Sequence, residues 1–66
     1  MKLTLNGELH DIAAVATVSD LLDSLCLAQK VVLVERNGHA VPRADFAFTK
    51  LAEGDAIEIV RLSAGG

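Results

Sequence analysis

The residues best placed to do chemistry in this 66-residue sequence stand at its C-terminal end, Ala64-Gly65-Gly66. Glycine has no Cβ, so such a segment can run extended through a narrow channel into the active site of another enzyme. The reactive group would be the α-carboxylate of Gly66, which a nucleophile attacks only after conversion to a mixed anhydride with phosphate. These residues are either a frayed terminus or such a delivered segment. In the second case we expect Gly66 to be the modified residue, with Gly65 and Ala64 threading the channel.

The other nucleophilic and metal-binding residue types do not combine into a site. Cys26 is the single cysteine, so neither an internal disulfide nor a four-thiolate iron–sulfur cluster can form. His10 and His39 stand apart from it in the sequence, and these three residues are too few for a four-ligand zinc site. Cys26 follows the apolar Leu25, and we interpret it as a small, semi-buried hydrophobic residue. We expect no catalytic residue and no bound metal.

The composition indicates one small folded domain. Apolar residues make up 52% of the chain, enough to build a core near the lower size limit of independent domains. The formal net charge is −3 and the basic residues are scattered, so a nucleic-acid backbone would be repelled. The sequence shows no apolar run of membrane-spanning length and no secretory leader pattern. We expect a cytoplasmic monomer that binds neither nucleic acid nor membrane.

The first half of the sequence predicts a hairpin followed by a helix. Residues 2–5 alternate polar and apolar and lead into Asn6-Gly7, a pair that favours a tight hairpin turn with a second strand at about 8–12. From Thr17 the spacing of the apolar residues changes from that of a strand to that of a helix. Thr17 is the expected N-cap, and Asp20 completes a capping box. The apolar positions then fall on one helical stripe: Val18, Leu21, Leu22 and Leu25.

The second half predicts three further strands. Residues 31–34 are all apolar, so a strand here would be apolar on both of its faces, as a central strand is. Asn37-Gly38 ends this strand. A short return at 39–41, a mostly irregular stretch at 43–53 and a final strand at 57–62 follow. The irregular stretch carries three expected hydrophobic anchors: Phe46, Phe48 and Leu51.

Hairpins separated by one helical crossover predict an α+β fold of the β-grasp, ubiquitin-like type. The expected architecture is a mixed sheet of four to five strands, with one main helix packed on one face and the first and last strands paired at the centre. We assign residues 1–62 to this domain and 63–66 to a flexible tail. The strand residues expected to face the helix are Leu3, Leu5, Val32, Val34, Ile57 and Ile59.

Strict alternation sends a second set of apolar residues to the opposite face of the sheet. Leu33, Val60 and Leu62 would lie there, and the sequence offers no second helix to cover them. A contiguous apolar patch on so small a protein usually marks a protein contact, which makes these residues a candidate partner-binding patch. The alternative is that Phe46 or Phe48 folds over this face.

Short motifs follow one another along the whole chain. They are Leu3-Thr4-Leu5-Asn6-Gly7-Glu8, Thr17-Val18, Leu21-Leu22, Asn37-Gly38, Val41-Pro42-Arg43, Gly54-Asp55, Ile57-Glu58-Ile59-Val60 and Gly65-Gly66. In order and spacing, this set resembles the ThiS family, the sulfur carriers of thiamine biosynthesis. Two departures are small: Phe46 stands where many relatives carry Trp, and Cys26 stands where relatives often have Gly.

The resemblance implies a protein co-substrate and not an enzyme. A ThiF-type adenylating enzyme would activate the carboxylate of Gly66, using ATP and Mg²⁺ that it binds itself, since this chain has no P-loop motif. A persulfide on a cysteine desulfurase or relay protein would supply sulfur, and the resulting thiocarboxylate would donate it to thiazole synthase, ThiG. Acidic residues that look solvated would meet basic residues of the adenylating enzyme: Asp11, Asp20, Asp23, Glu53, Asp55 and Glu58.

Two alternatives remain at the level of the sequence. The first is another Gly-Gly sulfur carrier, such as the small subunit of molybdopterin synthase, although those carriers are generally longer. The second, of a different class, is a β-grasp interaction or regulatory module similar to TGS domains. The acidic charge and the terminal glycines disfavour the second alternative, because an RNA-binding module needs a basic face and no particular terminus.

Overall fold

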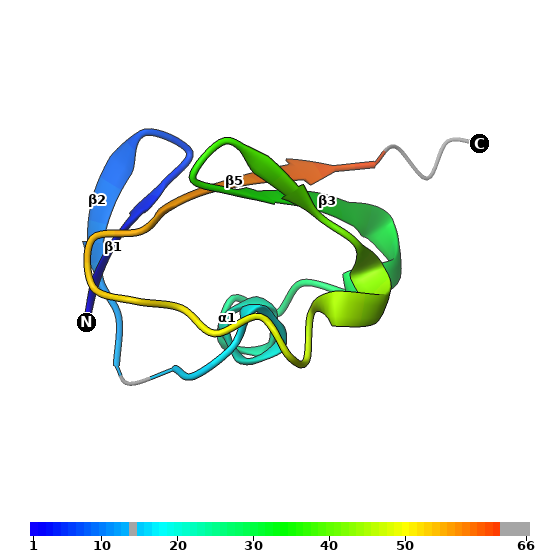
Figure 1. Ribbon diagram of the computed structural model, residues 1–66, viewed down its shortest axis with the longest axis horizontal. Helices are drawn as coiled ribbons and strands as arrows, with labels where there is room; N and C mark the ends of the chain where they lie inside the picture. The colour runs from blue at the N-terminus through cyan, green and yellow to red at the C-terminus, as the bar shows by residue number, and fades with distance from the viewer. Residues whose placement is uncertain (14, 63–66) are drawn as a thin grey trace.

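The computed structural model describes residues 1–13 and 15–62. The elements are β1 (Lys2–Leu5), β2 (Glu8–Asp11), α1 (Val18–Ser24), β3 (Val32–Arg36), β4 (His39–Val41) and β5 (Ala56–Arg61), with 3₁₀ turns at Gln29–Val31 and Arg43–Asp45. The strand and helix order predicted from the sequence is confirmed (Figure 1). The division at residue 62 stays a prediction, because 63–66 lie outside the described residues.

One five-stranded sheet runs through the molecule in the order β2-β1-β5-β3-β4. β1 and β5 pair in parallel at the centre, and the other three neighbouring pairs are antiparallel. α1 lies on one side of the sheet, and no helix or strand of the described chain lies on the other side (Figure 1). This is the predicted mixed sheet of the β-grasp type, with the first and last strands side by side.

Both tight hairpins use the turn chemistry that the sequence predicted. Asn6 and Gly7 have φ of 49° and 85°, and Asn37 and Gly38 have φ of 52° and 83°. Positive φ at both central residues matches the right-handed twist of the flanking strands, and Asn and Gly adopt it most readily. These turns fix the register of the β1–β2 and β3–β4 pairs.

The N-terminus of α1 is fully capped. Thr17 Oγ1 accepts a hydrogen bond from the Asp20 amide at 3.2 Å, and the Asp20 carboxylate accepts from the Thr17 amide at 3.1 Å. The amides of Val18 and Ser19 donate to carbonyls of the 46–49 segment at 3.0 Å each. The predicted capping box is confirmed, and it acts together with a neighbouring loop to satisfy the first amides of the helix.

The C-terminus of α1 ends in a Schellman motif centred on Cys26. The Leu27 amide donates to the Leu22 carbonyl at 2.9 Å, and the Cys26 amide donates to the Asp23 carbonyl at 3.1 Å. Cys26 has a φ of 59°, the left-handed conformation that glycine usually supplies at this position. Its side chain is exposed, so the interpretation of Cys26 as a semi-buried hydrophobic residue is wrong. Leu25 is likewise 38% exposed and not a core residue, because the helix stops before it.

The core lies between the inner face of the sheet and α1. Phe46 joins it although it comes from an irregular segment, and it is 1% exposed. Phe48 is 79% exposed, so its expected role as an anchor is wrong, while Leu51 is buried as predicted. The buried hydrophobic residues are Leu3, Leu5, Val18, Leu21, Leu22, Val32, Val34, Phe46, Leu51 and Ile57. Ile59 is half-buried against this cluster.

Asp55 is a buried carboxylate just before β5, so the prediction that it belongs to a solvated acidic face is wrong. It accepts hydrogen bonds from Arg36 Nε at 2.8 Å, Asn37 Nδ2 at 3.0 Å and the Ala52 amide at 2.8 Å. Burial raises its pKa, but the hydrogen bonds from Asn37, Ala52 and Arg36 and the charge of Arg36 outweigh burial and hold the pKa below the ordinary value of 3.8. Asp55 thereby ties the β3–β4 turn to the loop before β5.

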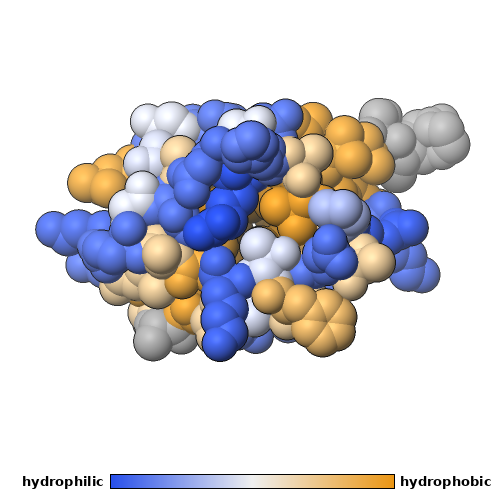
Figure 2. All heavy atoms as spheres, in the orientation of Figure 1, coloured by the Kyte–Doolittle hydropathy of each residue, from blue (hydrophilic) through white to orange (hydrophobic). Residues whose placement is uncertain are grey.

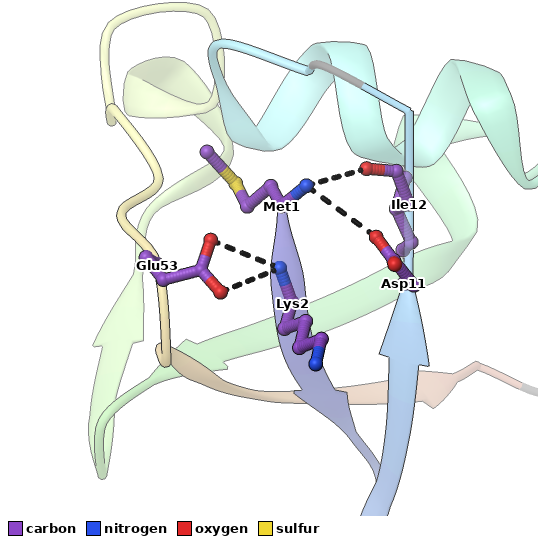
Figure 3. A network of polar contacts seen from close by, with 5 residues as sticks. All are labelled: Met1, Lys2, Asp11, Ile12 and Glu53. Carbon is purple, nitrogen blue, oxygen red and sulfur yellow. Dashed lines mark hydrogen bonds and ion pairs between the residues drawn. The ribbon is translucent and has the colours of Figure 1, made fainter.

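Two further acidic residues fasten the beginning of the chain (Figure 3). Both carboxylate oxygens of Glu53 accept from the Lys2 amide at 3.1 Å. The ammonium group of Met1 donates to the Ile12 carbonyl at 3.1 Å and lies 3.5 Å from the Asp11 carboxylate. The first strand is therefore held by side chains from both of its flanks.

Candidate functional site

The outer face of the sheet, the one turned away from α1, carries an exposed apolar pair. Leu33 on β3 and Val60 on β5 are opposite partners in the antiparallel ladder, and each is 57% exposed. Val32 and Val34, which flank Leu33 in β3, are buried in the core, and Ile59, which precedes Val60 in β5, is half-buried against it. Since successive side chains of a strand point to opposite faces, Leu33 and Val60 must lie on the outer face.

Leu62 extends this apolar surface just beyond β5. Its amide donates to the Val31 carbonyl at 2.6 Å, which keeps the chain beside β3 for one residue past the strand. Its side chain is 41% exposed and lines a shallow hollow together with Leu33 and Pro42. Hydrophobic atoms gather at the end of the molecule at which β5 finishes (Figure 2). We call Leu33, Val60 and Leu62 the outer strip.

No aromatic residue covers the outer strip. Phe46 packs in the core on the other side of the sheet, and Phe48 is itself almost entirely exposed. The alternative that one of them folds over the outer face is therefore wrong. The exposure of Leu33 and Val60 follows the predicted alternation, while their role in binding a partner stays a prediction.

A pair of carboxylates borders the outer strip. Glu35 on β3 and Glu58 on β5 are opposite partners one outward position along the ladder from Leu33 and Val60, and both are exposed. The sequence interpretation placed Glu58 among solvated acidic residues but did not single out Glu35. Glu35 stands two residues after Leu33 in the sequence and so points to the same face of the sheet. This spacing is the signal that would have identified Glu35.

The residues expected to carry the chemistry lie beyond the described part of the chain. Ala64, Gly65 and Gly66 are outside the described residues, and Leu62 is the last described residue before them. Gly66 is the fourth residue after Leu62, and a fully extended chain of four residues spans at most about 14 Å. The outer strip thus contains Leu62, the described residue after which the terminal segment begins.

The described residues contain no cluster of metal-binding side chains. Within 1–13 and 15–62, no group of three or more His, Cys, Asp or Glu side chains could hold a metal ion. His10 and His39 are both exposed. None of the helices in this part of the chain has the length and apolar character needed to cross a membrane.

The described chain forms a five-stranded β-grasp sheet with one helix, and an uncovered apolar strip lies at the end of β5, the central strand. These features define a small ubiquitin-like protein. A family model described as the ThiS family matches residues 3–66. This chain belongs to the ThiS family.

Relatives and solved structures agree with this assignment. A thiazole synthase of Paramagnetospirillum magneticum is 41% identical over all 66 residues, although the chain spans only 20% of that relative's length. A thiazole synthase of Magnetococcus marinus is 42% identical with the same coverage. The sulfur carrier protein ThiS of Bacillus subtilis is 40% identical over 50 residues, 76% of each protein. The crystal structure of the thiamine biosynthesis protein ThiS from Geobacter metallireducens superposes over both entire chains with a TM-score of 0.84 and 36% identity.

Proposed function

We propose that this chain is a sulfur carrier of thiamine biosynthesis and acts as a protein co-substrate. The observation that carries the proposal is the match of residues 3–66 to the ThiS family, which extends through both terminal glycines. Its relative in Bacillus subtilis is named a sulfur carrier protein. The described residues add an exposed apolar surface that supports docking of a partner.

The chemistry resides in the carboxylate of Gly66. One carboxylate oxygen of Gly66 attacks the α-phosphorus of ATP in the adenylating enzyme. Pyrophosphate leaves, and the carboxylate becomes an acyl adenylate. Sulfur from a persulfide then displaces AMP at the acyl carbon, and a thiol reductant cleaves the remaining S–S bond to leave a thiocarboxylate. Gly65 and Ala64 allow the segment to enter the enzyme, because small residues fit a narrow channel.

Three protein partners follow from this proposal. A ThiF-type enzyme supplies ATP and Mg²⁺ and docks on Leu33, Val60 and Leu62 while it holds the terminal glycines. A cysteine desulfurase or relay protein supplies the persulfide in the cytoplasm. Thiazole synthase accepts the sulfur, and the two thiazole synthases that contain a region similar to this whole chain support that association.

Intact-protein mass spectrometry tests the proposal. The chain ending at Gly66 is incubated with a ThiF-type enzyme, ATP, Mg²⁺ and a persulfide source, and we expect a mass gain equal to replacement of one oxygen by sulfur. A chain lacking Gly66 and a chain extended by one residue are the controls, and both should stay unmodified. An unmodified wild-type chain, with an enzyme shown active on a known carrier, would contradict the proposal.

A further inference from the structure

We propose that Glu35 and Glu58 form the charged part of the docking surface and together bind one basic side chain, an arginine, of the adenylating enzyme. The apolar surface around that arginine would cover Leu33 and Val60. The identity of the partner rests on the function proposed above. The existence and the charge of the surface come from the described residues alone.

The register of the sheet places the two carboxylates side by side. Glu35 and Glu58 are direct partners across the antiparallel β3–β5 pair, and both are exposed. Side chains at such positions have their Cβ atoms about 4.5–5.5 Å apart, and like charges placed there repel each other. An isolated domain gains nothing from this arrangement.

The described chain provides no countercharge for the pair. Its two ion pairs join the Met1 ammonium to Asp11 and Arg36 to Asp55, so neither Glu35 nor Glu58 takes part in one. Arg36 is adjacent to Glu35 in sequence, but it stands opposite Ile57 on the inner side and donates to Asp55. On the remaining side of Glu35, the partner across β4 is the uncharged Ala40.

Three other acidic residues of the described chain accept hydrogen bonds within the fold. Asp20 accepts amides at the start of α1, Glu53 accepts the Lys2 amide, and Asp55 is buried beneath Arg36. Glu35 and Glu58 instead offer their acceptor oxygens to the outside. A planar guanidinium has donors arranged to bridge two neighbouring carboxylates, whereas an ammonium is a compact point charge.

Position favours the enzyme that holds the terminal glycines as the source of that arginine. On the outer face, the Leu33–Val60 row lies between the acidic row and Leu62, beyond which the terminal segment continues. A protein that binds this segment and also covers the outer strip would have the two carboxylates as its next neighbours on the same face. Apolar contact and charge pairing would then be made in one continuous interface.

The test is the steady-state kinetics of adenylation, followed by ATP–pyrophosphate exchange with the ThiF-type enzyme at low and high salt. The variant Glu35→Gln/Glu58→Gln keeps the side-chain shapes and removes two charges. The matched control, Glu8→Gln/Asp45→Asn, removes two exposed charges that do not lie on the outer face, because Glu8 stands opposite the buried Leu5 and Asp45 lies in a 3₁₀ turn outside the sheet. We expect the first variant to raise KM about tenfold at low salt and to lose most of the salt dependence of KM, with kcat unchanged. The control should stay within about twofold of the wild type.

A purely structural role of the pair gives a different result. Removing two mutually repelling charges should leave the thermal unfolding midpoint of the Glu35→Gln/Glu58→Gln variant unchanged or higher. A lower midpoint, or a KM and salt dependence equal to those of the control, would overturn the inference. The proposed function fails separately, because its failure appears in the wild-type chain as the absence of a thiocarboxylate.

Discussion

Leu33 and Val60 face each other across the β3–β5 ladder on the side of the sheet that α1 does not cover, and each has more than half of its surface exposed. Their own strands are central enough to be rigid, with β5 lying between β1 and β3. Two adjacent strands therefore present apolar side chains to water from a fixed backbone. Burial of this area by a partner is favourable by roughly 25 cal/mol per Å².

Replacement of both residues by serine should weaken partner binding and leave the domain folded. Leu33→Ser/Val60→Ser removes apolar area at exposed positions, so we expect adenylation KM to rise by about tenfold or more, with a loss of stability near 1 kcal/mol. Leu9→Ser is the control, because Leu9 is also exposed but lies on the edge strand β2. Equal KM values for the two variants would contradict a docking role.

The two phenylalanines should differ sharply in their contribution to stability. Phe46→Ala opens a cavity in the core and should cost about 3–5 kcal/mol, a large part of the free energy of unfolding of a small domain. Phe48→Ala removes a side chain that touches mainly water and should cost less than about 0.5 kcal/mol. Urea unfolding followed by circular dichroism measures both, and similar losses would disprove this assignment of the core.

Asp55 should make stability depend on pH in the acid range. Because its folded-state pKa lies below the ordinary value of 3.8, the carboxylate stabilises the fold above that value, and this contribution is lost as pH falls through the lowered pKa. Asp55→Asn should cost about 1–3 kcal/mol near neutral pH, since three donors lose a charged acceptor.

Urea unfolding at about pH 7 and about pH 2 tests the role of Asp55. The difference in free energy of unfolding between wild type and Asp55→Asn should be largest near neutral pH and should shrink in acid. Asp45→Asn is the control, because Asp45 is exposed and has no ion pair among the described residues. A constant difference at both pH values would refute the linkage.

Cys26→Gly should raise stability. A left-handed φ of 59° is unfavourable for a residue with a side chain and is readily adopted by glycine, so we expect a gain of about 1 kcal/mol. Ser24→Gly, at the last helical position, should instead cost about 1 kcal/mol, because glycine increases the entropy of the unfolded chain and removes the hydrogen bond from Ser24 Oγ to the Leu21 carbonyl. Thermal unfolding of both variants provides the comparison, and a loss of stability in Cys26→Gly would show that the thiol contributes to packing.

Local sequence patterns were sufficient for most of the fold. Alternation at 2–5, helical spacing from Val18 and the two Asn-Gly pairs each reflect interactions between near neighbours, and all appear in the structure. The central pairing of the first and last strands also followed, because one helical crossover between hairpins allows few arrangements.

The errors concern residues whose environment is set by distant parts of the chain. Phe48 and Leu25 have the apolar character of core residues, but the loop and the helix end turn them outward. Asp55 reads as a surface acid, and only the approach of Arg36 and Asn37 from β3 and the following turn makes its burial favourable. No local pattern reports such contacts.

For the candidate site, alternation along single strands was enough to predict that Leu33 and Val60 are exposed. Predicting that Glu35 stands opposite Glu58 requires the register between the two strands. A single strand shows which face a residue occupies, but not which residue of the neighbouring strand stands beside it. The signal of Gly65 and Gly66 lies in their residue type and in their position after the last strand.

The parallel contact between β1 and β5 also constrains when this protein can fold. β5 follows every other element in the chain, yet it is the strand that joins β1–β2 to β3–β4. The N-terminal hairpin therefore gains its central neighbour only after the whole domain has been synthesised, and this closure spans more than 50 residues, from Thr4 to Ala56. Such sequence-distant pairing slows folding relative to local hairpins and helices. The segment that carries Gly66 is thus presented by a completed domain and not by a nascent one.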